Sequence, residues 1–202
     1  EPSALVLDLS GPIVEKTTRV GALDSVGSSL LDQDLPQENL LFDIVDTIRY
    51  AKNDDSVTGI VLALGNMSET GLNKLRYIAK ALNEFKTIGK PVFAVGDFYG
   101  QSQYYLASYA DKIFLSPQGG VLLKGYSAQP LYYRRLLDKL DITTHVFRVG
   151  TYKSAVEPFL RDDMSPQTKQ ANLNWLNQLW DTYLEDISSN REIDPNSLRI
   201  NE

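Results

Sequence analysis

The sequence has 202 residues, of which 43% are hydrophobic and 23% charged, and its formal net charge is −6. This is the composition of an ordinary globular domain with enough apolar residues for a sizeable core. The acidic balance argues against nucleic acid as a partner, because binding would need phosphate neutralisation. The absence of cysteine excludes disulfides, thiolate metal sites and a cysteine nucleophile. No metal-ligand cluster, phosphate-binding loop or dinucleotide fingerprint is present, so we expect no cofactor and no metal.

The first half of the chain alternates apolar runs with amphipathic segments. Near-continuous apolar runs predict strands buried on both faces at residues 4–9, 58–64 and 91–95. Apolar residues at helical spacing predict helices over 41–51 and 72–85. Residues 11–37 are polar and rich in glycine and serine, which predicts a long loop of the kind that is usually functional or mobile.

Shorter elements fill the second half, before one long helix. We expect a helix at 101–109, strands at 112–115 and 121–123, a helix at 133–140 and a strand at 143–149. Ser165 is a good N-cap and Pro166 suits the first helical position, so the long helix begins there. This alternating order predicts an α/β fold with a parallel sheet covered on both sides.

Both ends of the sequence resemble cuts from a longer chain. The sequence begins inside a strand-like run without an initiator Met and ends on polar residues after Pro195. It contains no secretory signal and no apolar run of transmembrane length. We expect a longer protein, with room for an anchor or signal ahead of residue 1.

Lys153 is the first candidate site residue. It follows the expected strand at 143–149, in a loop where Gly150 permits unusual backbone geometry. A lysine acts as a base only when it is neutral, and burial can lower its pKa from about 10.4 by several units. Phe159 could shield it from water, whereas Glu157 and the acidic residues at 162–163 could stabilise its charged form. From spacing alone, an exposed surface lysine is the better interpretation.

Ser102 is the second candidate. It lies after a strand and a glycine turn, at the start of a helix, which is the general context of an exposed nucleophile. A serine nucleophile needs a base, and the single histidine, His145, lies in a run whose alternation predicts a strand. From the residues alone, an ordinary helix-start serine and a structural histidine are the better interpretations.

The turn at residues 66–71 is a third candidate, because it follows a buried strand and opens a helix. Backbone N–H groups in such a turn could form an oxyanion hole or an anion site. The turn has one glycine, Gly71, and not a glycine run. A helix cap is therefore the better interpretation.

Residues 144–166, which contain the Lys153 segment, closely resemble the amino-terminal half of the long, bacterial form of the signal peptide peptidase A (protease IV) family. Residues 103–108 and 115–119 share this resemblance, which extends over most of the chain. The resemblance implies a Clp-protease/crotonase-like fold of repeated ββα units. It places an amino-terminal repeat at 1–164 and a helical extension at 165–202, leading to a carboxy-terminal domain beyond the sequence.

The same resemblance implies a serine–lysine endopeptidase. Lys153 matches the general base of the family, whose serine nucleophile lies in the carboxy-terminal domain. The resemblance implies that the full-length protein is a homotetramer anchored in the bacterial inner membrane, on the periplasmic side. It also implies that this enzyme degrades cleaved signal peptides. By this resemblance the anchor precedes residue 1, the peptide substrate is a signal peptide, and the fragment alone is inactive.

The sequence departs from the serine-bearing repeat of the family in ways that keep alternatives open. The glycine pair of the oxyanion turn is missing at 65–70, and bulky residues flank Ser102. These changes resemble a repeat that has lost nucleophile duty. However, Ser102 falls at or next to the nucleophile position, and its spacing to Lys153 is close to that of short family members. A self-contained Ser102/Lys153 peptidase is therefore one alternative.

A non-catalytic domain that serves assembly and shapes a substrate bowl is the second alternative. A crotonase-type acyl-CoA enzyme is the third, and the turn at 66–70 argues against it, because that chemistry needs a glycine-rich oxyanion turn.

Overall fold

The computed structural model describes residues 2–17, 38–145 and 154–198 of the chain. The described residues fall into two compact units. Unit 1 comprises residues 1–124 and 185–202, and unit 2 comprises residues 125–184. These units are defined by contacts within this chain. The predicted boundary at residue 164 separates the expected repeat from a helical extension in a longer protein, and it stays a prediction.

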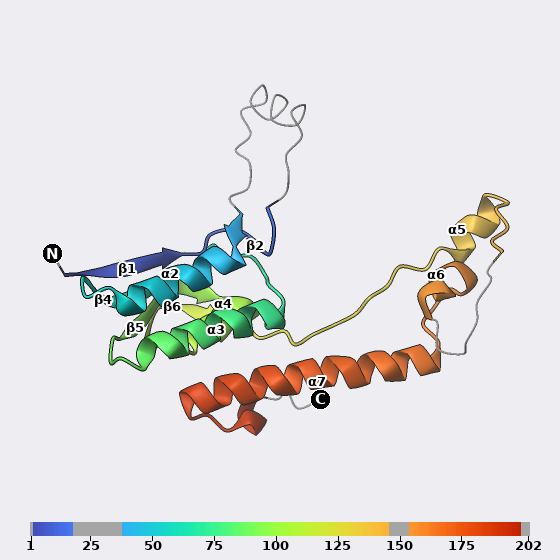
Figure 1. The fold of residues 1–202 in the computed structure, drawn as a ribbon. Coiled ribbons are helices and arrows are strands. Elements are labelled where there is room, and N and C mark those ends of the chain that lie inside the picture. The colour runs from blue at the N-terminus through green and yellow to red at the C-terminus, as the bar shows by residue number, and fades with distance from the viewer. Residues whose placement is uncertain (1, 18–37, 146–153, 199–202) are drawn as a thin grey trace. The chain divides into compact units, whose positions relative to one another are not determined.

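Unit 1 is built on a four-stranded sheet in which all neighbouring strands are parallel (Figure 1). In sheet order its strands are β1 (Ser3–Asp8), β4 (Val57–Ala63), β5 (Val92–Tyr99) and β6 (Lys112–Val121). The apolar runs that predicted strands lie in β1, β4 and β5, and the expected α/β class with a parallel sheet is confirmed.

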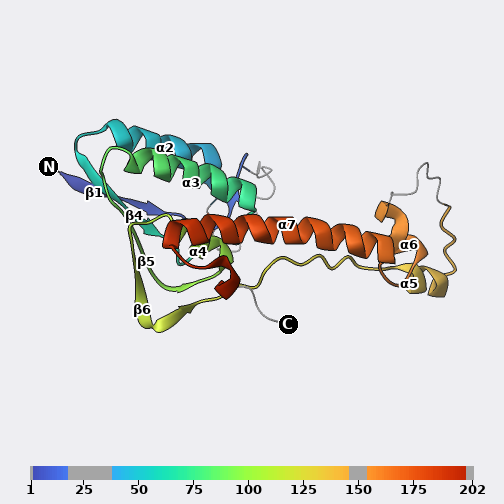
Figure 2. The same cartoon turned by 90° about the horizontal axis from the view of Figure 1, so that it is seen from below.

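Helices α2 (Leu41–Asn53) and α3 (Leu72–Lys86) lie on the same side of this sheet (Figure 2). Their apolar stripes pack into a core with the sheet residues that point toward them. The most buried core side chains include Ile48, Ile60, Leu62, Leu75, Ile78, Leu82, Phe85 and Val92. The spacing that predicted each helix is thus the spacing of the residues that it buries.

The opposite face of the sheet carries apolar side chains that remain exposed. Val6 is 61% exposed, Val95 48% and Phe114 55%. The expectation of a sheet covered on both sides is therefore wrong for the described part of unit 1. The apolar pattern of a strand records that both faces are apolar, but it does not say which segment covers the second face.

A second, two-stranded parallel sheet pairs β2 (Ile13–Val14) with β3 (Asn39–Leu40). β2 lies inside the range expected to be a loop, so that expectation is wrong at residues 13–14. Residues 18–37 of the expected loop lie outside the described residues.

Strand β6 is one continuous element where the sequence predicted two short strands. It lies at the edge of the sheet, where a proline is tolerated because no further strand needs its missing N–H. Pro117 lies within this strand. The backbone of β5 passes so close to Gly119 that a Cβ there would overlap the Asp97 carbonyl oxygen.

The remaining elements follow β5 and β6 in the chain. Helix α4 (Gln101–Ala107) belongs to unit 1, and unit 2 contains α5 (Arg134–Lys139), η1 (Ser154–Val156) and α6 (Glu157–Leu160). Helix α7 (Pro166–Arg191) starts in unit 2 and ends in unit 1, where η2 (Pro195–Leu198) follows.

Helix α7 begins where the sequence predicted. The Oγ of Ser165 accepts a hydrogen bond from the Thr168 N–H at 3.2 Å, which is the N-cap contact expected of a serine before Pro166. The strand expected at 143–149 is not found in its described part, since residues 143–145 have no regular secondary structure. Residues 146–149 lie outside the described residues.

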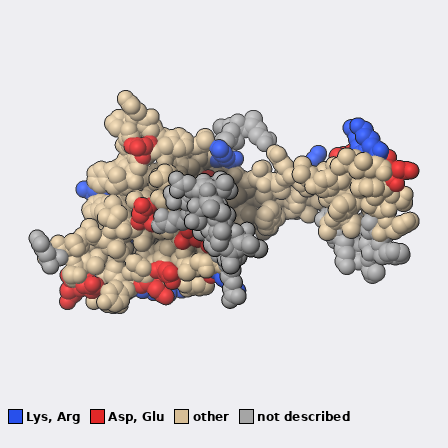
Figure 3. Space-filling model, turned by 90° about the horizontal axis from the view of Figure 1, so that it is seen from above, with Lys and Arg blue, Asp and Glu red and all other residues tan. Residues whose placement is uncertain are grey.

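Charged side chains of both signs are interspersed among uncharged ones on the face shown in Figure 3. Across residues 2–17, 38–145 and 154–198, no helix is both long enough and apolar enough to cross a membrane.

Candidate functional site

The carboxyl ends of β1, β4 and β5 meet at one edge of the parallel sheet, around a hollow of about 350 Å³. Ligands of open parallel sheets bind outside this edge. The hollow is lined by Asp8, Ser10, Gly65, Asn66, Gly96 and Asp97, among others. Hydrogen bonds from the Ser10 hydroxyl and N–H hold the pKa of the Asp8 carboxyl below its usual value. The edge is therefore polar and acidic.

The turn at residues 65–70 borders this hollow, and its backbone is largely committed to internal hydrogen bonds. The Met67 N–H donates to the Leu64 carbonyl at 3.0 Å, and the Ser68 N–H donates to the Gly11 carbonyl at 3.0 Å. The Thr70 N–H donates to the Ser102 Oγ at 3.0 Å. An oxyanion hole needs free N–H groups aimed at the ligand, and these three are not free.

The turn lies where a helix cap was expected, directly before α3, but it does not cap the helix with a side chain. Gly71 is the N-cap residue of α3, and it makes no side-chain capping bond. The rest of the turn is fastened by contacts across the fold and not by a local cap.

Ser102 is the second residue of α4, and its side chain is buried, with 4% exposure. Its Oγ donates to the Glu69 carboxylate at 2.6 Å and lies 3.1 Å from the Thr70 carbonyl oxygen. Together with the bond accepted from the Thr70 N–H, these contacts engage the hydroxyl both as donor and as acceptor. The geometry favours the interpretation of Ser102 as a structural serine.

Gln103 fastens the same turn from the next position of α4. Its Oε1 accepts a hydrogen bond from the Gly100 N–H, and its Nε2 donates to the Met67 carbonyl at 2.9 Å and to the Gly65 carbonyl at 3.2 Å. The bulky residues that replace the small flanks of the family's nucleophile thus have a function in the fold. They hold the turn against the start of α4.

Sequence reasoning missed Glu69 as the partner of Ser102. The two residues are far apart in the chain and share no local motif. They meet because parallel connections bring the ends of β4 and β5 to one edge of the sheet. The signal available was one acidic residue, Glu69, in the turn that follows β4.

Lys153 lies outside the described residues, with Gly150 and the rest of 146–152. His145 is described, and it is exposed and not in a strand, so its interpretation as a strand side chain is wrong.

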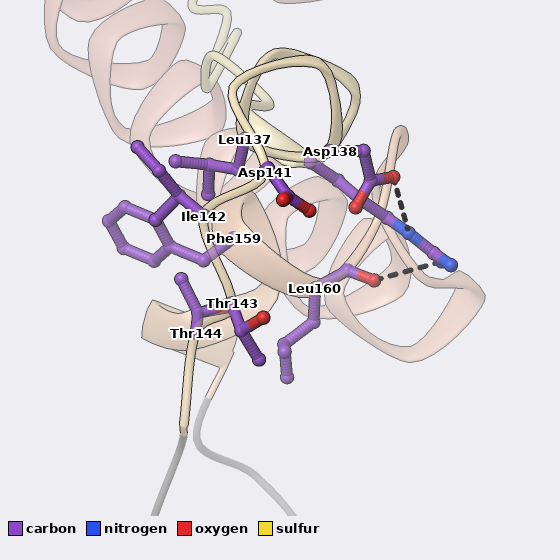
Figure 4. A pocket seen from close by; sticks show the side chains of 9 residues that line it. Leu137, Asp138, Asp141, Ile142, Thr143, Thr144, Phe159 and Leu160 are labelled. Atoms are coloured by element: carbon purple, nitrogen blue, oxygen red, sulfur yellow. Dashed lines mark hydrogen bonds and ion pairs between the residues drawn. The ribbon is translucent and has the colours of Figure 1, made fainter.

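Residues that flank the Lys153 segment on both sides line a pocket of about 380 Å³ in unit 2, shown in Figure 4. Arg134 borders it and donates to the Leu160 carbonyl at 3.2 Å. The other lining residues are Leu137, Asp138, Asp141, Ile142, Thr143, Thr144, Phe159 and Leu160. This pocket is lined by both apolar and acidic side chains of unit 2.

In the described ranges, no group of three or more histidine, aspartate or glutamate side chains could hold a metal ion.

A family model described as peptidase family S49 matches residues 84–200, more than half of the chain. The chain belongs to peptidase family S49. This is the family that the resemblance of the Lys153 segment predicted.

Curated relatives agree with the S49 assignment. Protease 4 of Salmonella typhi is 56% identical over 197 residues, covering 96% of this chain and 32% of that protein. Protease 4 of Haemophilus influenzae is 43% identical, covering 94% and 31%. The chloroplastic Serine protease SPPA of Arabidopsis thaliana is 25% identical over 138 residues, covering 68% and 20%. The S49 chain thus spans about a third of the length of the first two.

Solved structures similar to the S49 chain include an enoyl-CoA hydratase/isomerase family protein from Silicibacter pomeroyi. It is 16% identical with a TM-score of 0.31, covering 78% of this chain and 81% of that one. A second enoyl-CoA hydratase/isomerase family member is 15% identical with a TM-score of 0.38, covering 79% and 72%. The α/β class of the S49 chain rests on the sheet topology described above.

Proposed function

We propose that this chain supplies Lys153 as the general base of a serine–lysine endopeptidase, whose serine nucleophile lies in the part of the protein beyond residue 202. Membership of peptidase family S49 supports peptide hydrolysis. The observation that carries the proposal is the state of Ser102. Its hydroxyl is buried and hydrogen-bonded to Glu69 and Thr70, so this serine serves the fold and is not presented to a substrate.

The proposed mechanism moves one proton back and forth. Neutral Lys153 accepts the proton of the serine hydroxyl, and the serine oxygen attacks the scissile carbonyl to form an acyl-enzyme. The lysine then returns the proton to the leaving amine. In deacylation it takes a proton from the water that attacks the acyl-enzyme and passes it to the departing serine oxygen, which restores the serine hydroxyl and the neutral lysine. A lysine can do both when burial brings its pKa near the ambient pH.

We propose cleaved signal peptides as the substrate, a homotetramer as the assembly, and the periplasmic side of the bacterial inner membrane as the place of action. The family resemblance of the Lys153 segment supports these three points. The lengths of the relatives support a larger protein with room for a further domain, because the chain spans about a third of the Protease 4 relatives.

The test is hydrolysis of an apolar reporter peptide by the full-length protein carrying Lys153→Ala. Removing a general base that also serves as proton donor lowers kcat/KM by about 10²–10⁴-fold. Lys139→Ala, at an exposed lysine of unit 2, is the matched control and keeps full activity. Circular dichroism checks that both variants fold.

Retention of hydrolysis by Lys153→Ala would favour a non-catalytic assembly domain over the proposal. The self-contained Ser102/Lys153 site is tested in the same assay with Ser102→Ala, which we expect to keep its activity once it is shown to be folded.

A further inference from the structure

The face of the unit 1 sheet that points away from α2 and α3 has a composition that the strand register defines (Figure 2). Paired residues of neighbouring strands point to the same face, and so do residues two apart on one strand. Two rows of side chains therefore cross this face from β1 to β6. The first row is Val6, Val61, Phe93 and Lys112. The second row is Asp8, Ala63, Val95 and Phe114. We call these two rows the open face.

The apolar residues of the open face reach solvent, whereas the residues between them on the same strands do not. Val95 is 48% exposed, but its neighbour Ala94 is fully buried. The centroids of the Phe93 and Phe114 rings lie 6.2 Å apart, as expected for two side chains on one face of neighbouring strands. Parallel sheets that are apolar on both faces are normally covered on both. The open face therefore lacks the layer that its composition requires.

The two charged residues of the open face lie at its opposite corners. Lys112 ends the first row on β6 and Asp8 ends the second row on β1, and these two strands are the edges of the sheet. Both side chains are exposed. None of the ion pairs in the described part of the chain involves Lys112. A positive corner thus lies diagonally across an apolar centre from a negative corner.

The Asp8 carboxylate is ionised and has one oxygen available. The Ser10 N–H and Oγ both donate to its Oδ1, at 2.9 and 2.6 Å. These bonds hold the pKa of Asp8 below its usual value. None of the described hydrogen bonds uses the Asp8 Oδ2. This oxygen can therefore accept a bond from a cation outside the chain.

This arrangement of charges is complementary to itself. A two-fold axis lying between two stacked open faces exchanges the ends of the diagonal, so Lys112 of each copy lies over Asp8 of the other. One symmetric contact then forms two ion pairs and buries the two apolar centres against each other. Sheets that pack face to face are about 10 Å apart, a gap that lysine and aspartate side chains can bridge together.

We infer that the open face is a self-association surface, on which a second copy of this chain packs through a two-fold axis with Lys112 of each copy paired to Asp8 of the other. An apolar segment of another protein would match only the centre of the face, whereas a second copy also matches both charged corners. The inference is separate from the role proposed for Lys153, because it concerns assembly and not hydrolysis.

The first test is the mass of the 202-residue chain in solution, measured by analytical ultracentrifugation. We expect a dimer of the 22.6 kDa chain in reversible equilibrium with the monomer. Lys112→Glu replaces both ion pairs with like-charged pairs, so the dissociation constant of the dimer rises about 10-fold. Adding Asp8→Lys reverses the other corner and restores the dimer. A role of these residues within one copy would not give this rescue, because they lie at opposite edges of the sheet.

Lys169→Glu is the matched control, because it makes the same change of net charge at an exposed residue of α7 and leaves the dissociation constant unchanged. Phe114→Ser removes an apolar side chain from the open face and weakens the dimer about 10-fold or more. Circular dichroism checks the fold of each variant. If a variant of the 202-residue chain does not fold, the mass of the full-length protein gives the same comparison. There Lys112→Glu yields smaller species, and adding Asp8→Lys restores the assembly.

The second test uses cysteines, of which this chain has none of its own. Asp8→Cys/Lys112→Cys places two thiols on β1 and β6, about 14 Å apart within one copy. A disulfide needs Cα atoms within about 7 Å, so it forms only between copies. On mild oxidation we expect one dimer band on a non-reducing gel and no larger species. Each single cysteine variant stays monomeric on the gel, because the axis places identical corners far apart.

A parent chain that is monomeric at every concentration overturns the inference, and means that something other than a second copy covers the open face. An unchanged dissociation constant in Lys112→Glu, or the absence of rescue by Asp8→Lys, also overturns it. A ladder of cross-linked species contradicts the two-fold axis, because only a contact that does not close on itself gives a ladder.

Discussion

The elements around Ser102 and the elements that flank Lys153 in the chain differ in how many of their side chains are buried. Ser102 lies beside a core whose central side chains, such as Ile78 and Phe85, are fully buried. The elements next to Lys153 in the chain, α5 and α6, contain no buried residue, and Leu136 of α5 is 54% exposed. In this well-packed region the side chain of Ser102 is itself buried and hydrogen-bonded to Glu69. The elements that flank Lys153 in the chain have no buried core of this kind.

The first way to break this contrast is to remove a large side chain from each unit. Phe85→Ala should lower the free energy of unfolding of the 202-residue chain by about 3–5 kcal/mol, because it leaves a cavity in the core of unit 1. Leu136→Ala should change it by only about 0.5 kcal/mol, as is usual for surface positions. Urea unfolding measures both. Equal losses would mean that α5 has a core of its own.

A second, smaller effect separates two serines that each donate to a carboxylate. The Ser102 Oγ is buried and donates to Glu69 at 2.6 Å, whereas the Ser56 Oγ donates to Asp54 at 2.7 Å on the surface. Ser102→Ala should cost about 1–3 kcal/mol, because it removes a hydrogen bond to a carboxylate and leaves the half-buried Thr70 N–H without its acceptor.

Ser56→Ala should cost less than about 1 kcal/mol, because water replaces the lost partner. Urea unfolding of the two variants gives the comparison. A Ser102→Ala protein as stable as the parent would show that Ser102 does not hold the turn at 65–70.

The smallest effect is the pH dependence of the stability at the start of α7. There the Glu157 carboxylate accepts hydrogen bonds from Ser165 and Thr168. The folded-state pKa of Glu157 lies below the usual 4.5, so the stability that it contributes is complete above that value and is lost as the pH falls through the lower folded value. Amide protection factors measure the loss. We expect protection at Ser165 to fall between pH 6 and pH 3 while Ile78 stays protected. Unchanged protection at Ser165 would contradict the role of Glu157 in holding the start of α7.

Much of the fold could be predicted because its signals are local. Apolar runs locate β1, β4 and β5, helical spacing locates α2 and α3, and the Ser165–Pro166 pair gives the start of α7. Each of these signals is contained in the residues that form the element, so no knowledge of distant contacts is needed.

The errors arose where the outcome depends on distant residues. The sequence predicted two short strands where β6 forms one continuous strand at the edge of the sheet. The alternation around His145 predicted a strand, but alternation has this meaning only where something covers one face. The bond between Ser102 and Glu69 depends on topology alone, so the sequence could offer a helix-start serine and no partner for it.

The uncovered face of the sheet in unit 1 has a consequence for synthesis. Chains emerge from the ribosome at about 5–20 residues per second. In the proposed arrangement this chain precedes a further domain in a protein about three times as long, so unit 1 would be complete tens of seconds before the carboxyl terminus is made. Val6, Val95 and Phe114 would face water during that interval. Apolar strand surface of this kind is what chaperones bind and what causes nascent chains to aggregate.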